Sequence, residues 1–551
     1  MKTNNIKQYI MGFLVSCGTA AALSGLASCS DWDDHYEDMA TNEAASQLTL
    51  WETMQQYPEL SDFREVLSKT EIYRHNKKTG VNYAQLLNGS QAFTVMAPVN
   101  GQFDKDALLQ LVETNQGDST VELNFVKNQL SNNVVSNADS VANFFLLNGK
   151  RATIGGGKII DTPISEDKAN IKAKGGVLHI LDKPLTYRHN LYEAMLNMPE
   201  FSKVGQQLKS YEKDIFMPSA SIEGDMIDGE QTYIDSVFYK SNILLSGMSG
   251  MMYEDSTAIM VMCTDNEFQR VWDEAMSYFK FGPNVAGADS LQRLYANRNL
   301  LSDAFFSTAI QASPKDSLVT YSYNKRYPQY HVFHKPFDEG GILYGATPID
   351  CSNGTLYKTD KWPFTPQMTY QRELRTEGES TYLILKEEKL SKEPHTLVAD
   401  SISETAYMEI NPNPASASWS ITYKLENTLS GTYDICAIIL PTTVYDPEAE
   451  KIRPNKFRAT ITYVDEKGNE VKDEVLGKGL VNNEFKVDTV VLKKDFKFPT
   501  CNYNQENAKV YITLTDEVSK NDLAKNKYTR KLFLDCIYLR PKSNVKPEAE
   551  E

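Results

Sequence analysis

The residues best suited to chemistry in this chain do not fall into any familiar catalytic spacing. The sequence holds no G-x-S-x-G nucleophile elbow, no H-E-x-x-H zinc motif, no phosphate-binding loop and no dinucleotide fingerprint. The GMSG stretch at residues 247–250 lacks the flanking pattern of an elbow. Among 73 acidic residues, a glycosidase carboxylate pair cannot be recognised from spacing alone. We therefore predict that the protein is not an enzyme and has no catalytic residues, and keep an unrecognised polysaccharide hydrolase as an alternative.

Residues that could bind a metal are present, but their spacing predicts no metal centre. Residues 223–230 hold four acidic residues without the regular ligands and closing Glu of a calcium loop. His331 and His334 would point to opposite faces of a strand, because side chains alternate. No C-x-x-C pair occurs among the five cysteines beyond residue 29, and a pairing of Cys436 with Cys536 stays open. We predict neither a metal nor another cofactor.

Aromatic side chains are the best candidates for a binding role. They make up 11% of the chain, with 30 tyrosines. An aromatic face suits the C–H face of a sugar ring, so we take Tyr407, Trp419, Tyr423 and Tyr433 as exposed binding candidates. Alternation puts Trp419 and Tyr423 on one face of a strand, a pattern that more often indicates core packing. Both interpretations stay open.

Three patterns that occur twice, in the same order, show how the chain is organised. Gly176, His179 and Asp182 of the third pattern correspond to Gly354, Tyr357 and Asp360 of its repeat. One domain type used twice explains such an order. The three pairs are residues 48–67 and 191–208, residues 93–103 (FTVMAPVNGQF) and 259–268 (IMVMCTDNEF), and residues 171–185 (IKAKGGVLHILDKPL) and 349–364 (IDCSNGTLYKTDKWPF).

The FTVMAPVNGQF and GGVLHILD motifs resemble those of the fasciclin-type adhesion domain. The resemblance implies an α+β fold with two tandem fasciclin-like domains, the first over residues 48–187 and a divergent second over 188–367. It also implies that His179 is structural, a buried histidine bonding to backbone, which fits its replacement by Tyr357. The family often has a His-apolar-apolar segment between the motifs, and residues 128–135 (NQLSNNVV) lack that histidine.

Periodicity predicts the helices and strands inside each copy. Pro58 splits residues 48–67 into two short helices, and Ser61 with Asp62 should cap the second one. Residues 217–239 are expected to form an acidic loop. The remaining helices are expected at residues 103–112, 122–130, 267–280 and 290–309, and strands joined by an Asn148-Gly149 turn at residues 141–160.

After Gln367 the pattern changes to nearly pure strand. Short runs with period-two alternation predict an all-β sandwich of the jelly-roll kind over residues 368–545, followed by an acidic tail over 546–551. The runs TYDICAIILP and LFLDCIYLRP resemble the paired inner strands of galactose-binding-like carbohydrate-binding sandwiches. The runs are residues 381–386, 406–410, 419–425, 431–440, 458–464, 486–492, 508–514 and 531–539.

The N-terminus has the features of an export leader and an anchor. Lys2 and Lys7 precede an apolar run over residues 10–26 that is too short and too punctuated for a spanning helix. The LASC sequence ending at Cys29 resembles a bacterial lipobox. This implies a signal peptide over residues 1–28 and a lipid on Cys29. The acidic run over residues 30–37, within a tether over 29–47, resembles the surface-export signal of Bacteroidetes lipoproteins. This implies an outer-membrane anchor facing the cell exterior, and an anchor facing the periplasm is the alternative.

Charge and resemblance together define the expected partners. The net charge of −16 argues against a nucleic-acid partner, because no basic stripe is available to replace counterions. Fasciclin-like lipoproteins of this bacterial group often accompany outer-membrane glycan importers. The resemblance therefore implies adhesion or binding, with extracellular glycan as ligand. The alternative is a protein–protein scaffold that docks an outer-membrane importer and binds no sugar.

Overall fold

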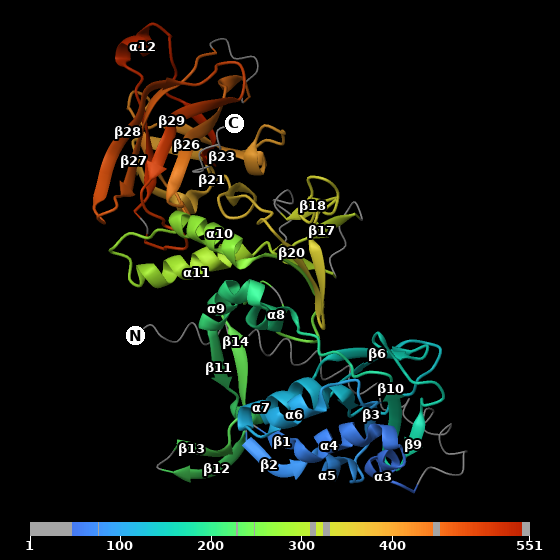
Figure 1. Cartoon of the computed structure of the whole chain (residues 1–551). Coiled ribbons are helices and arrows are strands. Elements are labelled where there is room, and N and C mark those ends of the chain that lie inside the picture. The colour runs from blue at the N-terminus through green and yellow to red at the C-terminus, as the bar shows by residue number, and fades with distance from the viewer. Residues whose placement is uncertain are drawn as a thin grey trace, which may run out of the picture. The chain divides into compact units, whose positions relative to one another are not determined.

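The computed structural model describes residues 47–74, 77–227, 230–246, 248, 250–308, 316–322, 331–444, 452–507 and 509–542 (Figure 1). The leader, Cys29, nearly all of the acidic tether and the C-terminal tail lie outside the described residues. The chain divides into two compact units, residues 1–188 and 189–551. Within the described part, no helix has the length and apolar character needed to cross a membrane.

The first unit is built on a sheet with strand order β4-β3-β10-β9. Strands β3 (Phe93–Pro98) and β10 (Gly176–Leu181) run parallel at its centre, with Gly176 opposite Phe93. β4 (Leu130–Ser131) and β9 (Ile171–Ala173) flank them antiparallel. The helices are α3 (Leu50–Gln55), η1 (Pro58–Leu60), α4 (Ser61–Lys69), α5 (Tyr83–Leu87), α6 (Lys105–Val112) and α7 (Asn115–Val121).

Smaller strands complete the first unit. Residues 122–130, expected to be one helix, form a π turn (Glu122–Val126) and a 3₁₀ turn (Lys127–Gln129) before β4. The expected strands around Asn148-Gly149 are present in a sheet of order β5-β6-β7-β8. The bounds are β1 (Glu71–Arg74), β2 (Lys77–Asn82), β5 (Ala142–Phe145), β6 (Arg151–Gly155), β7 (Lys158–Ile159) and β8 (Thr162–Pro163).

The motif residue Asn100, and not Ser61 or Asp62, caps helix α4. Its Oδ1 accepts the Asp62 N–H at 2.9 Å, and its Nδ2 donates to Ser61 Oγ at 2.9 Å. The prediction that residues 61–62 supply the cap is therefore wrong, because a side chain from the β3 loop reaches the free N–H groups first. The motif residue Asn100 thus ties the loop after the central strand to the first helix pair.

The second unit repeats this architecture with a sheet of order β16-β15-β20-β19. β15 (Ala258–Cys263) and β20 (Gly354–Thr359) are parallel, with Gly354 opposite Ala258. Counting from these strand starts, Asp265 takes the place of Asn100 and accepts the Lys203 N–H at 2.8 Å. The other elements are α8 (Leu191–Asn197), η4 (Pro199–Phe201), α9 (Ser202–Ser210), α10 (Asp265–Tyr278), α11 (Ala288–Leu301), β16 (Phe305–Ser307), β17 (Ser317–Val319), β18 (Val332–His334) and β19 (Thr347–Cys351).

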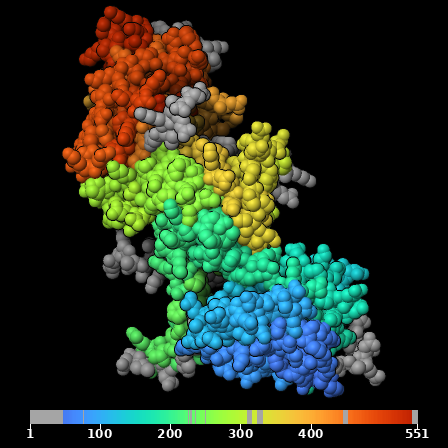
Figure 2. Space-filling view, in the orientation of Figure 1, coloured from blue at the N-terminus to red at the C-terminus, as the bar shows by residue number. Residues whose placement is uncertain are grey.

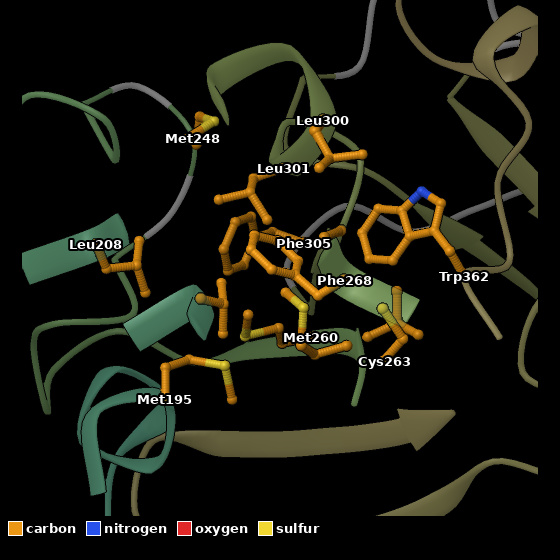
Figure 3. Packing of buried hydrophobic residues seen from close by; sticks show 14 of the residues in the cluster. Met195, Leu208, Met248, Met260, Cys263, Phe268, Leu300, Leu301, Phe305 and Trp362 are labelled. Atoms are coloured by element: carbon orange, nitrogen blue, oxygen red, sulfur yellow. The ribbon is translucent and has the colours of Figure 1, made fainter. Parts of the chain in front are cut away.

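The core of this second α/β domain collects apolar side chains from both helix pairs and the sheet. Figure 3 shows Met195 of α8, Met260 of β15, Phe268 of α10, Leu301 of α11 and Phe305 of β16 converging in one cluster. Helix α11 ends at Leu301, so the expected helix over 290–309 is too long. The chain there turns into β16, whose Ser307 pairs with Ala258, because burying Phe305 beside the central strand outweighs continuing the helix.

An antiparallel arm, defined by residues 212–242, extends from this domain. The expected loop over residues 217–239 is wrong, because most of this stretch is strand. The arm pairs β11 (Glu212–Phe216) with β14 (Phe238–Asn242), and β12 (Ile222–Ile227) with β13 (Glu230–Asp235). The acidic composition of the stretch led to the loop prediction, and the pairing of the strands with each other decides the structure instead.

The C-terminal region is a two-sheet β-sandwich, as expected. One sheet has the order β23-β24-β31-β26-β29, with β21 also paired to β31, and the other has the order β22-β25-β30-β27-β28. The bounds are β21 (Leu374–Glu377), β22 (Ile384–Glu388), β23 (Leu390–Thr396), β24 (Ala406–Pro412), β25 (Ser420–Lys424), β26 (Gly431–Leu440), β27 (Lys456–Val464), β28 (Glu470–Val481), β29 (Asp488–Phe498), β30 (Tyr511–Asp516), α12 (Lys520–Ala524) and β31 (Leu532–Pro541).

The sandwich packs directly on the second α/β domain. Cys501 donates its N–H to Lys280 O at 2.7 Å, and the Lys280 N–H donates to Ser430 Oγ at 3.1 Å. Leu429 and Cys501 belong to the α/β core cluster. In Figure 2 the light-green atoms of α10 and α11 meet the orange atoms of the sandwich. Residues 189–551 thus form one compact unit.

Candidate binding site

The four aromatic residues predicted to be exposed are buried. Tyr407 is 4% exposed, and Trp419, Tyr423 and Tyr433 are each 0% exposed. The prediction of an exposed aromatic platform is therefore wrong. The alternation that placed Trp419 and Tyr423 on one strand face points that face into the space between the two sheets, where aliphatic side chains from both sheets surround them.

Hydrogen bonds confirm that these aromatics are part of the packed interior. Trp419 Nε1 donates to Arg530 O at 2.6 Å, and the Tyr423 hydroxyl donates to Gly378 O at 2.9 Å. Buried aromatic polar atoms normally have such partners. None of these rings can stack on a sugar at the surface.

His179 is structural, as the resemblance implies. It is 0% exposed, its Nε2 lies 3.0 Å from Val135 O, and its Nδ1 lies 3.3 Å from the Asn170 N. These partners assign the proton to Nε2, which donates, while Nδ1 accepts. Burial lowers the pKa of His179, so the ring stays neutral. The residue ties β10 to two loops and has no exposed nitrogen to offer a substrate.

His331 lies near a serine and an aspartate, but not in a catalytic order. Ser322 Oγ and Asp303 Oδ1 both lie on the Nδ1 side of the ring, at 3.3 and 3.5 Å, while an Arg372 nitrogen lies 3.3 Å from Nε2. A relay needs the nucleophile and the acid on opposite ring nitrogens. His331 is buried and His334 is exposed, so the prediction that they point to opposite faces is confirmed.

The cysteines of the described residues are all buried and free, so Cys436 and Cys536 do not form a disulfide. In the strand register Cys436 lies opposite Tyr538, and Cys536 lies opposite Ile438. Burial raises the pKa of Cys263 to about 12, which keeps that thiol protonated and unreactive.

Two carboxylates come together inside the sandwich, where sequence analysis did not place them. Glu377 of β21 and Asp535 of β31 are 7% and 0% exposed, and the Ser403 hydroxyl donates to Glu377 Oε1 at 2.8 Å. Desolvation and the neighbouring Glu377 raise the pKa of Asp535 to about 7. Ligand atoms of Glu377, Asp535 and Cys536 lie within 4.8 Å of one another, so this set could hold a metal ion. Its burial closes it to a polysaccharide substrate.

One concave site of ligand size among the described residues lies where the sandwich meets the second α/β domain. We call it the junction groove, a cavity of about 560 Å³. Three segments far apart in the sequence form it. Its lining consists of Gly282, Asn284, Val285 and Ala286 after α10, Val464, Gly468 and Glu470 around the β27–β28 turn, and Thr500, Cys501, Asn502, Gln505, Glu506, Asn507, Lys509 and Val510 before β30.

Hydrogen bonds hold the walls of the junction groove in place. Asn284 Nδ2 donates to Gly468 O at 2.7 Å and so links the two walls. Gly468 has φ +83°, and a Cβ there would lie 2.4 Å from Asn284 Nδ2, so only glycine fits this turn. Glu470 accepts from Lys509 Nζ and from the Tyr511 hydroxyl, each at 2.9 Å, and these bonds lower the pKa of Glu470. The groove thus presents an ionised acceptor at a fixed position.

The mouth of the groove carries exposed planar side chains. Glu506, Asn507 and Lys509 are exposed, and Gln505 is half-buried. Among the described residues that line the groove, none is aromatic. Recognition there would rest on amide and carboxylate hydrogen bonds, with Val464 and Val510 supplying apolar contact. No pattern in the sequence indicated this site, because loops that converge in space share no local pattern.

A second, shallower concavity of about 420 Å³ lies on the outer face of the β22–β28 sheet. We call it the hydroxyl furrow. The Thr422 and Thr513 hydroxyls are hydrogen-bonded to each other at 2.9 Å within it. Tyr511 lines the furrow, and its hydroxyl donates to Glu470, which lines the junction groove. Its lining is Leu385, Lys386, Ser420, Thr422, Thr462, Lys472, Asp473, Tyr511 and Thr513.

No protein-family model matches the chain, and no curated protein sequence matches it. Solved structures give distant likenesses only. A family is therefore not established by comparison.

Three solved structures illustrate these distant likenesses. The CBM22-1–GH10 modules of Clostridium thermocellum xylanase 10B, complexed with xylohexaose, are 15% identical over 33% of this chain and 28% of theirs, with a TM-score of 0.18. A Paenibacillus xanthan lyase is 15% identical over 35% of this chain and 16% of its own, with a TM-score of 0.21. A FAS1 domain pair of the insect cell adhesion molecule Fasciclin I is 10% identical over 50% of this chain and 90% of its own, with a TM-score of 0.19. The chain thus spans less than a third of the first two proteins, and TM-scores of this size do not establish a shared fold.

Proposed function

We propose that the protein is a surface-anchored lipoprotein that binds extracellular glycan in the junction groove. The observation that carries the proposal is the groove itself: a concave site of ligand size, walled by hydrogen-bonded loops and lined by amides and a carboxylate. In this proposal the lipid on Cys29 holds the chain on the outer membrane, facing outward. The two α/β domains are fasciclin-like, and the sandwich is of the galactose-binding-like jelly-roll kind.

The chemistry of the groove fits a hydroxyl-rich ligand better than a charged one. Amide groups such as those of Gln505 and Asn507 donate and accept at once, which matches sugar hydroxyls that do the same. Glu470 is ionised and already shares its charge with Lys509, so the groove has a strong acceptor without a large net charge. Binding through neutral hydroxyls should therefore depend little on salt.

The experiment is a polysaccharide array probed with the soluble chain starting at Ser30. We expect retention on one polymer class that persists in high salt. The double variant Gln505→Ala/Asn507→Ala should retain at least tenfold less, because two hydrogen-bonding amides are worth roughly 1.4 kcal/mol or more. Gln55→Ala/Asn197→Ala, which removes two exposed amides elsewhere, is the matched control and should bind normally. Equal retention by the two double variants would show that the glycan does not bind in the groove.

The same array distinguishes binding from catalysis. Retention without release of soluble products supports a protein that binds and does not cleave, as proposed. Product release that survives purification would support the hydrolase alternative. The buried pair Glu377 and Asp535 would not be its catalytic pair, since neither carboxylate reaches solvent.

A second candidate function, a scaffold for an outer-membrane importer, is favoured by the arm. Its strands expose large apolar side chains: Ile222 is 50%, Met226 65%, Phe238 54% and Tyr239 46% exposed. Gathered apolar exposure on one element is typical of a protein contact. Co-purification with an outer-membrane protein that is lost in Phe238→Ser/Tyr239→Ser, together with no glycan retention, would favour this function over the first.

A further inference from the structure

A set of ligand-type side chains lies on the outer face of the sandwich, apart from the junction groove. Glu393 and His395 belong to strand β23, and Glu409 belongs to β24. Met408 and Ile410 of β24 fill the core, so the alternating residue Glu409 projects from the opposite face. The register places Glu393 directly opposite Glu409. Two carboxylates facing each other across strands repel, and Lys531 Nζ, 3.1 Å from Glu409 Oε1, already offsets part of this repulsion.

The three ligand atoms are already close. One ligand atom from each of Glu393, His395 and Glu409 lies within 4.8 Å of the other two. His395 Nε2 and Glu409 Oε2 are 2.8 Å apart. Two ligands of one tetrahedral Zn²⁺, each at about 2.0 Å, are about 3.3 Å apart. A shift of a few tenths of an ångström would therefore let a metal ion take the place of the proton between them.

Neighbouring residues fix the orientation of these ligands. Glu409 Oε1 accepts from Asn411 Nδ2 at 2.8 Å and from Lys531 Nζ at 3.1 Å, which turns Oε2 toward His395. The His395 ring stacks on buried Tyr407 with centroids 5.3 Å apart and an interplanar angle of 26°. Such outer contacts, which orient a carboxylate and an imidazole, are typical of metal sites.

We infer that Glu393, His395 and Glu409 form a binding site for a zinc-class divalent cation. An imidazole with two carboxylates suits Zn²⁺ and Co²⁺ better than Ca²⁺, which prefers oxygen ligands alone. Three protein ligands leave one coordination position open to water or to a group from another molecule. Since β23 is the edge strand of its sheet, the ion would also cross-link β23 to β24.

The chain starting at Ser30, freed of metal with a chelator, is titrated with Zn²⁺ by calorimetry and with Co²⁺ by visible absorption. We expect one site on the sandwich surface whose affinity falls at least tenfold in His395→Ala and in Glu393→Gln. Glu393 is exposed, so its variant keeps the fold. Lys531→Gln removes a competing cation and should tighten binding. His334→Ala, an exposed histidine elsewhere, is the matched control and should leave binding unchanged.

The interior set Glu377, Asp535 and Cys536 is the competing explanation, and the experiment separates the two. A thiolate–cobalt charge-transfer band, or binding lost in Asp535→Asn but kept in His395→Ala, would overturn the proposal. Absence of saturable binding would overturn it as well. Binding weakened by both His395→Ala and Glu393→Gln, without a thiolate band, would establish the site.

Discussion

The two α/β domains share one sheet architecture and differ in the segment that follows their first helix pair. In the first domain this segment is the short hairpin β1–β2, where Lys78 pairs with the fully buried Asp118 at 2.7 Å and the Tyr73 N–H donates to Glu122 at 3.0 Å. In the second domain the segment is the arm. Its anchoring contact lies at the base, where the Tyr192 hydroxyl donates to Glu212 at 2.8 Å.

This difference shows that the same sheet architecture can carry either a hairpin held against its helices or an arm that exposes apolar side chains. The first domain uses buried carboxylates to hold its hairpin against the helices, where Ile72 is half-buried and Val81 is 40% exposed. The second leaves apolar side chains exposed on the arm and joins its helix α10 region to the sandwich, which creates the junction groove. Residues 189–551 thus hold the junction groove and the arm, while the first unit has a concavity of about 550 Å³ lined in part by Phe144, Phe145 and Arg151.

The largest effect is expected at the glycine that opens the central parallel strand of each domain. A Cβ at Gly354 would lie 1.9 Å from Ala258 O, and at Gly176 it would lie 2.1 Å from Phe93 O. We expect Gly354→Ala and Gly176→Ala each to lower the free energy of unfolding by about 3 kcal/mol or more. Calorimetry should show each loss in its own unit. If one substitution destabilised both units, the prediction that the two units unfold independently would be wrong.

Breaking the hairpin anchor should cost the first domain more than breaking the arm base costs the second. Glu122 accepts from the buried Tyr83 hydroxyl at 2.9 Å and pairs with Lys127 at 3.0 Å. Glu122→Ala leaves these groups unpaired and should lower stability by about 2–3 kcal/mol, against about 1 kcal/mol for Glu212→Ala. Urea unfolding of both variants makes the measurement. Equal losses would mean that the arm is as firmly held as the hairpin.

Substituting the capping residues tests whether the two α/β domains are built alike, with a smaller expected loss of stability. Asn100→Ala and Asp265→Ala each remove a side chain that accepts an N–H at the start of a helix, so each should cost about 1 kcal/mol. Asn100→Asp keeps the acceptor and should cost less than Asn100→Ala. If Asp265→Ala were neutral while Asn100→Ala was not, the two caps would not be equivalent.

The units should respond to pH in opposite directions. Burial lowers the pKa of His179 from 6.5, so the first unit is more stable above about pH 6.5 and loses stability as pH falls. The pKa of Asp535 is raised from 3.8 to about 7, so its contribution is full below about pH 4 and is lost as pH rises through 7. Thermal unfolding between pH 5 and 8 should show both trends. His179→Gln should flatten the pH dependence of the first unit's melting temperature, and Asp535→Asn that of the second unit. An unchanged pH dependence in either variant would refute the assignment of that trend to the residue.

Local rules predicted much of the fold, and long-range contacts decided the rest. Pro58 and the Asn148-Gly149 turn mark boundaries by backbone chemistry alone, and Gly176 with Gly354 revealed the duplication. The end of α11, the cap from Asn100 and the strands of the arm depend on which distant segment packs alongside. The periodicity of a single segment does not predict these three features.

The candidate site was harder to predict than the fold for a physical reason. The same alternation that marks an exposed ring also marks a ring between two sheets, so the pattern at Trp419 and Tyr423 could not decide between a binding platform and core packing. The junction groove draws on loops more than 200 residues apart in sequence, from Asn284 to Lys509, and none of them carries a motif. The ligand set of Glu393, His395 and Glu409 depends on strand register, which no single segment encodes.

The most direct test of the account is amide hydrogen exchange of the chain starting at Ser30, with and without the array polysaccharide that retains it. We expect protection around residues 282–286, 464–470 and 500–510, with the first unit unchanged. Protection confined to the first unit, around residues 93–103 or 171–181, would contradict the claim that binding lies in the second unit. The absence of any retained polysaccharide would contradict glycan binding itself.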